Sequence, residues 1–423
     1  MKKVILFSLL FAISISAQSF DAVSLSMAEN YTAVSRGIYS MTWNPANLSM
    51  PRGNTLELNI LSLNMNLYNN ALSVNNFNQY FTEEGHGGRW SDSDKHAIMD
   101  LIDDGLKFNV NYSVNVLGVA FKNFAVSIQS NAQGGAELIS NKKLFKTVLF
   151  GDSLTRDYAF KDPKLAKGSA YSASKISAGY SYPIKIYKFL DIPGIKTVCA
   201  GINFNYYLGN AVVQTKKSGI SVKRYENDQD DEILEYELRF INQTAYIENS
   251  FPAGNGFGID LGFSTYYQKK WQFSWSFENL FGSIYWNQNT EVQKLIEKDS
   301  LLFDDLIDKD AEDTSISIDT TYNRSSFSTR LPVKMRVGAS YKWNKELLLS
   351  MDWHQGFDSY FGNTSTPQVG VAAEYFAMPW LPLRMGMSVG GSHGFLFGLG
   401  FGLHAPGFQF DYSYGMNKGM WPS

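Results

Sequence analysis

The stretch GFLFGLGFGLHA, at residues 394–405, alternates large apolar side chains with small residues. Glycine holds most of the positions between the apolar ones, which are Phe395, Phe397, Leu399, Phe401 and Leu403. Successive side chains of a β-strand point to opposite faces. The pattern therefore predicts a strand with one bulky apolar face and one small face.

The same alternation recurs through most of the chain. It is clearest at 257–267, 271–278 and 408–414, where aromatic residues hold one parity and Gly, Ser, Gln or Asp hold the other. At 55–67 the apolar parity changes near Ile60, which predicts a bulge or bend. These segments together predict about 14 strands. Further strands are expected near 108–117, 119–130, 169–182, 197–215, 219–226, 233–247, 333–343, 346–354, 367–376 and 382–391.

The N-terminus has the pattern of a cleaved signal peptide. Two lysines precede an apolar run at 4–15, and Ser16 and Ala17 are small enough for a cleavage site. Residues 1–17 are therefore expected to be removed, so that the mature chain begins at Gln18. A short buried core helix is the alternative interpretation.

The composition favours a large exported β-protein. The 423 residues are 15% aromatic and include 35 glycines. The only cysteine is Cys199, so neither a disulfide framework nor a cysteine-based zinc site is expected. A formal net charge of -3 implies no strong attraction to nucleic acid. The mean hydropathy of -0.20 argues against a bundle of inner-membrane helices.

The predicted fold class is all-β, a transmembrane antiparallel β-barrel located in the outer membrane. A soluble β-sandwich or secreted adhesin also alternates, with its apolar face inward. The barrel is favoured because Phe, Trp, Tyr and Leu dominate one parity in strand after strand while Gly, Ser, Asn and Asp dominate the other. A lipid-facing band with aromatic girdles predicts this distribution.

The connections between the strands differ in length. Very short ones, at 269–270, 344–345 and 405–406, are typical of periplasmic turns. Residues 92–104 have the caps and spacing of a helix that stops at Gly105. Two other connections, 141–150 and 291–308, also resemble helices, and the second is acidic enough to be a solvated loop.

Residues 29–48, ENYTAVSRGIYSMTWNPANL, carry a resemblance to a known family. They resemble the N-terminal region of the FadL-like outer-membrane barrels, the long-chain fatty acid transporters, and also the PorV-like proteins of Bacteroidetes. Further matching stretches are GFGIDLGF at 256–263, ENLFGSIYW at 278–286, LPVKMRVGASY at 331–341, PQVGVAAEY at 367–375 and LPLRMGMSVGG at 381–391.

The resemblance implies fourteen strands and an N-terminal segment folded into the lumen. Residues 18–54 would be this plug, and 55–423 the barrel. In the fatty acid transporters the ligand leaves sideways through a gap in the wall. In the PorV-like proteins the barrel serves a secretion system as a partner.

The candidate plug residues are Trp43, Asn44, Pro45 and Ala46. Pro45 fixes φ and lacks a donor, so it disfavours a helix at Asn44. A structured turn that carries Trp43 suits a lumen plug, and a plain turn before the first strand at Thr55 is the alternative.

Charged residues on the small parity are expected to face the lumen, because a charge on the lipid face is costly. Both signs are present, so pairing inside the barrel is the main expectation and an ion path is the alternative. These residues are Asp260, Glu278, Arg336, Asp352, Glu374, Arg384 and Asp411, with Lys342 near a strand end.

No enzyme, cofactor or metal site is expected. His354, His393 and His404 have serines nearby, but no Gly-x-Ser-x-Gly motif is present. The five histidines are scattered, and the acidic run at 228–232 lacks the spacing of a calcium loop.

Two functions remain open. One is a channel for hydrophobic small molecules across the outer membrane. The other is a structural or secretion-linked barrel that holds a protein partner. Membrane lipid is an expected partner in both, and nucleic acid in neither.

Overall fold

The computed structural model describes residues 21–71, 73–87, 90–102, 105–138, 145–146, 149–150, 159–162, 164–189, 192–226, 232–302 and 316–417. The expected signal peptide, and most of the connection at 141–150, lie outside these residues.

A single antiparallel sheet makes up most of the described chain. The strands are β1 Leu56–Asn59, β2 Ser62–Asn69, β3 Leu106–Phe121, β4 Phe124–Leu138, β5 Ala159–Asp162, β6 Ala166–Ile184, β7 Val198–Glu226, β8 Glu232–Tyr246, β9 Gly254–Tyr267, β10 Trp271–Trp286, β11 Glu291–Leu302, β12 Ile316–Asn323, β13 Phe327–Arg330, β14 Lys334–Lys342, β15 Leu347–Gly356, β16 Gln368–Met378, β17 Leu381–Gly390, β18 Gly394–Ala405 and β19 Phe408–Asn417. The stretch at 394–405 is β18, as its alternation predicts.

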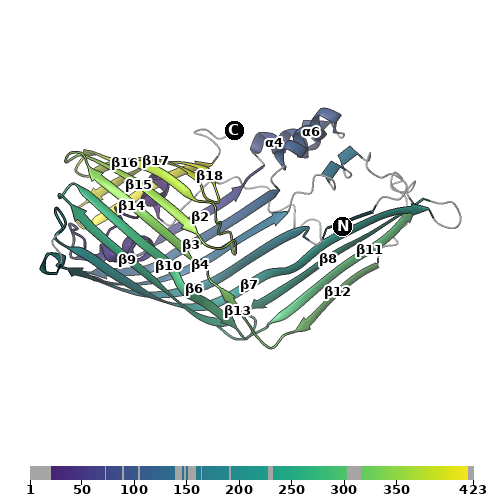
Figure 1. Cartoon of the computed structure of the whole chain (residues 1–423), viewed down its shortest axis with the longest axis horizontal. Coiled ribbons are helices and arrows are strands. Elements are labelled where there is room, and N and C mark those ends of the chain that lie inside the picture. The colour runs from purple at the N-terminus through teal and green to yellow at the C-terminus, as the bar shows by residue number, and fades with distance from the viewer. Residues whose placement is uncertain are drawn as a thin grey trace.

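The sheet curves into a barrel wall (Figure 1). Ladders link β3, β4, β6, β7, β9, β10 and then β14 to β19 in turn. Outward side chains are large, apolar and exposed, as at Phe263 and Trp275. Inward neighbours such as Ser264 and Ser276 are small, polar and buried. The predicted fold class, an antiparallel barrel with an apolar outer face, is confirmed.

Several strands continue past the barrel as an extension of the same sheet. We define this extension as β5, β8, β11, β12 and the part of β7 after Asn210. β8 and β9 both pair with β7 in the same direction, so they are two pieces of one long strand. Two further long strands are divided into pieces in the same way. One consists of β10 and β11, and the other consists of β12, β13 and β14. Because some strands are divided in this way, the 19 strand segments correspond to fewer strands of the wall. The expected number of about 14 strands stays a prediction.

The expectation of a helical or looped acidic connection at 291–308 is wrong for 291–302. This stretch is β11, which pairs with β8 on one side and β12 on the other. Val292 and Ile296 are buried in the sheet, and Lys298 forms an ion pair with Glu237 at 3.0 Å. Lys298 of β11 therefore has a cross-strand partner, as is common in antiparallel sheets, and the charge of this stretch does not indicate a loop.

Three helices follow β2: α4 Val74–Phe81, α5 Glu83–His86 and α6 Asp92–Leu101. The prediction of a helix at 92–104 is confirmed. Ser91 and Asp94 form a capping box at its start, and Gly105 has a φ of +77° beyond its end. The helices of the described residues lack the length and apolar character that crossing a bilayer requires.

The first and last strands of the wall meet at a seam. β1 and β2 are two pieces of one strand, broken near Ile60 as predicted, and both pair with β3. β19 pairs with β18, and no residue pairing joins it to β1 or β2 in the described part of the chain. The backbones of β19 and β2 also stay apart along most of their length.

The direction of the strands explains this seam. β2 and β19 both run away from the end of the barrel that carries the short turns at 122–123 and 406–407. They are therefore parallel to each other, whereas every ladder of the wall is antiparallel. The antiparallel pattern of the wall thus cannot be continued across the seam.

Candidate functional site

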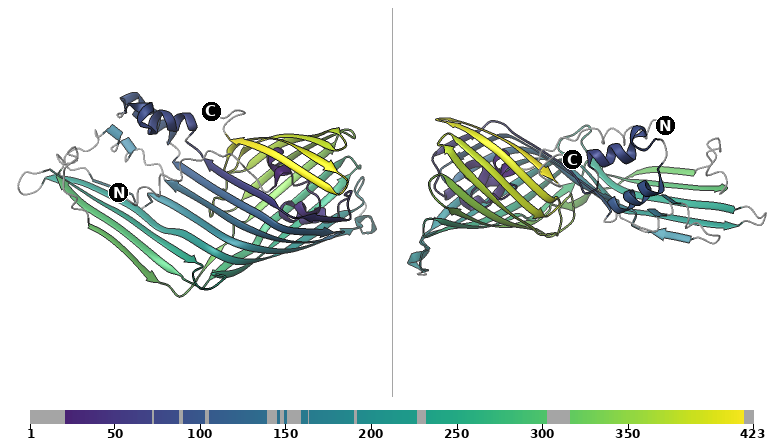
Figure 2. Two further views of the ribbon diagram at one scale, coloured as in Figure 1. Left: turned by 180° about the vertical axis from the view of Figure 1, so that it is seen from behind. Right: turned by 90° about the horizontal axis from the view of Figure 1, so that it is seen from above.

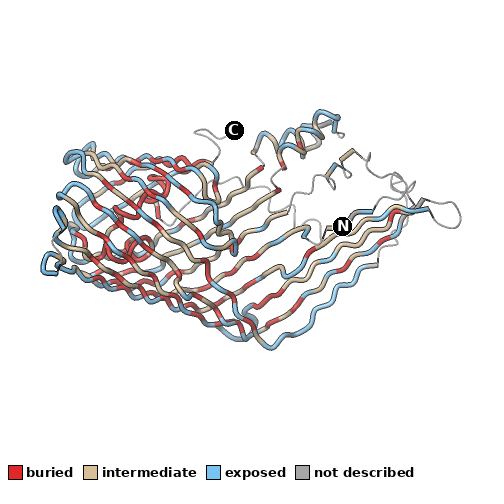
Figure 3. Tube along the Cα trace, in the orientation of Figure 1, coloured by how far each residue is buried: buried red, intermediate tan, exposed pale blue. Residues whose placement is uncertain are grey.

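The segment from Asp21 to Met50, which we call the inner segment, lies inside the barrel (Figure 2). It folds as α2 Ala22–Ser26, η1 Gly37–Tyr39, α3 Ser40–Trp43 and η2 Pro45–Ser49. Almost all of it is buried, and it lies where buried residues gather in the barrel (Figure 3). Its described residues thus occupy the lumen region where the resemblance places a plug.

Two of the four short helices of the inner segment, α2 and η2, begin at a capping side chain. The Asp21 carboxylate accepts a hydrogen bond of 2.7 Å from the Ser24 N–H and caps α2. The Asn44 side chain accepts one of 3.0 Å from the Ala46 N–H and caps η2, with Pro45 at its first position. Asp21 also bonds to Trp43 and Asn44 also bonds to Ser264, so each cap stabilises its own helix and a contact with another part of the protein.

Glycines on the inner face of the wall form a recess for the inner segment. A methyl group on Gly398 would lie 2.0 Å from the Leu25 carbonyl oxygen, and one on Gly201 would lie 2.3 Å from the Ala46 nitrogen. The small residues that alternate with large ones in the sequence thus face the lumen, and they also allow the backbone of the inner segment to approach the wall closely. Eight further wall glycines also leave no room for a methyl group beside the inner segment: Gly118, Gly179, Gly262, Gly338, Gly370, Gly386, Gly400 and Gly415.

The inner segment touches both sides of the seam. Helix α2 packs on β17, β18 and β19, whereas η1 packs on β1, β3 and β4. On the β1 side, the Glu57 carboxylate accepts a hydrogen bond of 3.2 Å from the Ile38 N–H. The two unpaired wall strands are therefore linked from inside by one piece of chain.

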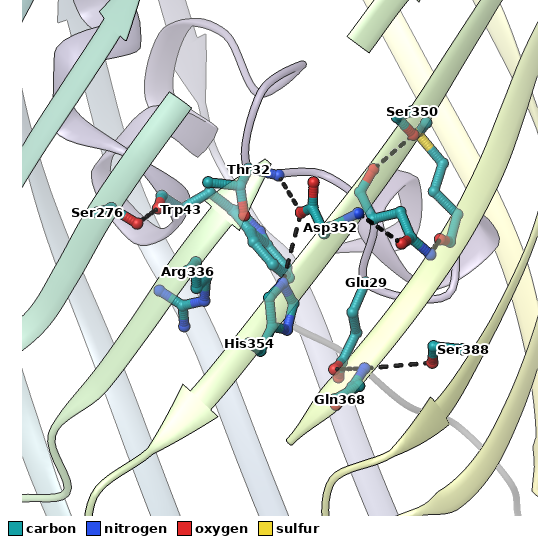
Figure 4. Close-up of polar contacts among 12 residues, drawn as sticks. Glu29, Thr32, Trp43, Ser276, Arg336, Ser350, Asp352, His354, Gln368 and Ser388 are labelled. Carbon is teal, nitrogen blue, oxygen red and sulfur yellow. Dashed lines mark hydrogen bonds and ion pairs between the residues drawn. The ribbon is translucent and has the colours of Figure 1, made fainter. Parts of the chain in front are cut away.

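Trp43 has the largest side chain of the four candidate plug residues, and 1% of its surface is exposed. Its indole N–H donates to Asp21 at 3.1 Å, and its carbonyl accepts from the Ser276 hydroxyl at 2.8 Å. The Arg336 guanidinium lies 5.0 Å from the ring centre (Figure 4). Trp43 thus joins α2, α3 and the wall.

The other three candidate plug residues lie against β6, β7 and β9. The Asn44 amide donates to the Ser264 hydroxyl at 3.1 Å. Pro45 and Ala46 lie over Gly201 and Gly262. The Ala46 carbonyl accepts a hydrogen bond of 2.9 Å from Ser181. The four residues act as one docking turn on the wall.

Six of the seven wall charges singled out in the sequence take part in two salt-bridge groups or bind the inner segment. Arg336 pairs with Glu278 at 2.5 Å. Arg384 pairs with Glu374 at 2.7 Å and with Asp411 at 2.6 Å. The carboxylate of Asp352 accepts a hydrogen bond of 2.7 Å from the Thr32 N–H (Figure 4).

The seventh charge, Asp260, is 6% exposed and accepts hydrogen bonds from the Asn279 N–H and the Asn205 amide, each at 2.8 Å. Lys342 is exposed at the end of β14. The lumen charges are thus matched by partners, which gives little support to an open ion path.

A polar cavity of about 50 Å³ lies between the inner segment and the wall. Ile38, Tyr39 and Thr42 line it from the inner segment. The wall side is dominated by amides, hydroxyls and phenols from β2, β3, β4, β6, β7 and β10: Ser62, Asn64, Asn111, Tyr112, Ser113, Asn115, Gln129, Asn131, Ala132, Gln133, Tyr171, Lys175, Tyr207, Glu278 and Asn279.

Comparison with known proteins places the chain in a family. The family model that matches, over residues 45–412, is described as "Family of unknown function (DUF5723)". The chain belongs to this family. No curated protein matches this DUF5723 chain.

Solved structures that resemble this DUF5723 protein are transporters and channels. The toluene transporter TbuX of Ralstonia pickettii is 13% identical with a TM-score of 0.48, and 95% of this chain and 93% of that one are covered. The monoaromatic hydrocarbon channel CymD is 10% identical with a TM-score of 0.36, over 94% and 97%. The Pseudomonas putida toluene transporter TodX is 10% identical with a TM-score of 0.30, over 88% and 93%.

Asn30 and Asn47 of the DUF5723 chain are docking residues that sequence reasoning missed. Ser350 donates to the Asn30 carbonyl at 2.9 Å. Asn47 donates to Thr32 at 2.9 Å and accepts from Ser264 at 2.6 Å. Both residues are almost fully buried. Single polar residues in a segment without periodicity give no signal, although both lie within the stretch 29–48 that carried the family resemblance.

Histidines of this DUF5723 barrel that were weighed as catalytic lie beside carboxylates. His404 is 3.1 Å from Asp411, and His354 is 3.4 Å from Asp352 (Figure 4). His393 is 3.8 Å from Glu29. Within the described residues, none of these histidines has a serine hydroxyl as hydrogen-bond partner, so no nucleophile–base pair forms there.

Burial changes the acidity of Asp21 in this DUF5723 protein. Loss of solvent raises the pKa of its carboxyl from 3.8 to about 6, against the opposing effect of the hydrogen bonds from Ser24 and Trp43. Asp21 caps α2 and also holds Trp43, so its proton is linked to how the inner segment docks.

Proposed function

We propose that the protein is an outer-membrane channel that passes hydrophobic small molecules and is closed by its inner segment. The apolar outer face, the short turns at one end and the export-like N-terminus support the location. Two of the similar solved structures, the toluene transporter TbuX and the monoaromatic hydrocarbon channel CymD, agree with the class of solute.

The observation that carries the proposal is the seam between β2 and β19. It is the one place in the described wall where neighbouring strands share no ladder, and the inner segment crosses it from inside. A shift of the whole inner segment, which carries α2 away from β19, would open a lateral path from the lumen to the bilayer. The free energy of a hydrophobic molecule falls when it leaves by that path, because the molecule enters lipid directly.

Fixing the inner segment to the wall tests this function. The hydroxyl oxygens of Ser49 in η2 and Ser181 in β6 are 2.6 Å apart, so the pair Ser49→Cys and Ser181→Cys is placed to form a disulfide. Cys199 lies beside Met50 and is replaced by Ala to avoid a competing thiol. Uptake of the hydrophobic dye N-phenyl-1-naphthylamine is then measured in Gram-negative cells that carry the protein.

We expect the oxidised double variant to lose the uptake and a reductant to restore it. The matched control is Ser177→Cys with Asn205→Cys, which joins β6 to β7 within the wall without touching the inner segment. This control should keep its uptake when oxidised. Equal uptake by the protein with and without the Ser49–Ser181 crosslink would contradict the proposal.

The alternative function, a barrel that holds a secretion partner, has no contact or surface in its favour among the residues described. The channel is therefore the single function proposed.

A further inference from the structure

The polar cavity lies between the inner segment and the strands β2, β3, β4, β6, β7 and β10 of the wall. Its floor is a row of side chains at paired positions on neighbouring strands. Gln129 of β4 stands opposite Asn115 of β3 and Lys175 of β6, and Lys175 stands opposite Tyr207 of β7. A second row runs from Asn64 of β2 through Ser113 to Asn131. The cavity is thus built from regular sheet positions.

Two amides of this cavity present their polar atoms to its interior. Asn64 and Gln129 are each 8% exposed, and neither side chain forms a hydrogen bond with another side chain or with the backbone among the described residues, so both are available to a molecule in the cavity. Their neighbours are satisfied: Ser113 donates to Asn131 at 2.7 Å, and Tyr207 donates to Asn279 at 2.7 Å. Amides inside a protein almost always have a hydrogen-bond partner, which can be water. Asn64 and Gln129 therefore bond to whatever occupies the cavity, either water or the polar groups of a ligand that replaces it.

The charges of the cavity indicate a neutral partner. Lys175 is the one cation and Glu278 the one anion among the described lining residues. Glu278 pairs with Arg336 at 2.5 Å, and Lys175 also interacts electrostatically with Asp260, so two cations face two carboxylates and the charges around the cavity balance. Amides and phenols supply both donors and acceptors, which suits a ligand whose hydroxyl or amide groups also do both.

We propose that this cavity binds the hydroxyl or amide groups of a neutral polar moiety, such as a sugar. The inference rests on the proposed channel, because it names a polar group that a passing molecule carries in addition to its hydrophobic part. A volume of about 50 Å³ accommodates one or two waters, or the one or two hydroxyl groups that replace them. The rest of the ligand extends along β3 and β4, where Asn111 and Gln133 continue the polar lining.

Binding to the purified full chain tests the inference without any transport. The protein is held in a detergent that has no sugar headgroup, and ligand-observed NMR follows three probes that differ in charge: glucose, gluconate and glucosamine. N-acetylglucosamine serves as a second neutral probe. We expect saturable binding of the neutral sugars and at least tenfold weaker binding of the charged ones.

Substitution of the two unpaired amides should remove this binding. Gln129→Met and Asn64→Leu keep the volume and delete the polar atoms, so each should weaken glucose binding at least tenfold. Because neither amide has a protein partner, the melting temperature should stay the same or rise. The control Gln243→Met removes an amide that Arg324 already bonds at 2.6 Å, outside the cavity. It should lower the melting temperature and leave glucose binding intact.

Three results would overturn the inference. The first is that neither neutral probe binds saturably, which would mean that the cavity holds water only. The second is that gluconate binds as tightly as glucose, and the third is that Gln129→Met binds glucose as tightly as the native protein. Dye uptake separates this failure from failure of the channel. If uptake depends on the Ser49–Ser181 crosslink while no sugar binds, only the present inference is lost.

Discussion

At the scale of the residue, Asp21 couples pH to the docking of the inner segment. Its pKa of about 6 lies above the ordinary value of 3.8 because the carboxyl is buried, so the folded protein binds this proton more tightly than the unfolded chain. The resulting stabilisation is complete below about pH 4 and is lost as the pH rises through about 6. About two pKa units correspond to at most about 3 kcal/mol.

The variant Asp21→Asn should remove this pH dependence. It cannot ionise, and it keeps one acceptor oxygen, so that one of the two donors, Ser24 or Trp43, loses its acceptor at every pH. We expect thermal unfolding, followed by tryptophan fluorescence between pH 4 and pH 7, to show a smaller fall in melting temperature for the variant than for the native protein. Parallel curves would mean that another group sets the slope.

A substitution at Gly398 tests how closely α2 fits its recess in the wall. In Gly398→Ala the new methyl group meets the Leu25 carbonyl, so α2 must shift, at a cost of about 1–3 kcal/mol. Trypsin should then cut faster after Arg36 in the inner segment. Gly168→Ala is the control, since its methyl group meets only ordinary contacts at 3.6 Å and beyond. Equal cleavage of both variants would show that the recess is looser than described.

At the scale of the element, η2 depends on Asn44 twice, as helix cap and as wall contact. Asn44→Ala removes the cap on Ala46 and the bond to Ser264, which together should cost about 2–3 kcal/mol. We expect a lower melting temperature and faster tryptic cleavage after Arg36. Ser49→Ala loses the hydroxyl contact with Ser181 and a long hydrogen bond of 3.3 Å to the Ala46 carbonyl, but it keeps the helix cap, so it should change both much less.

The elements also show what the sequence could and could not predict. β18 and β9 follow from their alternation, and α6 from its caps, because these signals are local. β11 was misassigned because the partner of Lys298 is on β8, a strand that is distant in the sequence. The placement of Trp43 to Ala46 needed the resemblance. Gln129 and Asn64 read as ordinary inward polar residues, since lack of a partner is a property of three-dimensional packing.

At the scale of the whole molecule, the outer face should lie in lipid while the inner segment does not. Single-tryptophan variants in bilayers with brominated acyl chains can measure this. Trp275 is 43% exposed on the outward face and should be strongly quenched, whereas Trp43 is 1% exposed and should not. Similar quenching of the two residues would contradict the transmembrane orientation of the wall.

The seam gives this molecule an unusual order of assembly. Helix α2 belongs to the first part of the chain to be made, yet its recess consists of β17, β18 and β19, which are made last. The recess therefore does not exist until the final strand is in place. Completion of the wall and docking of the N-terminal end are then a single event, and a chain that stops after β16 would leave its own beginning without a binding surface.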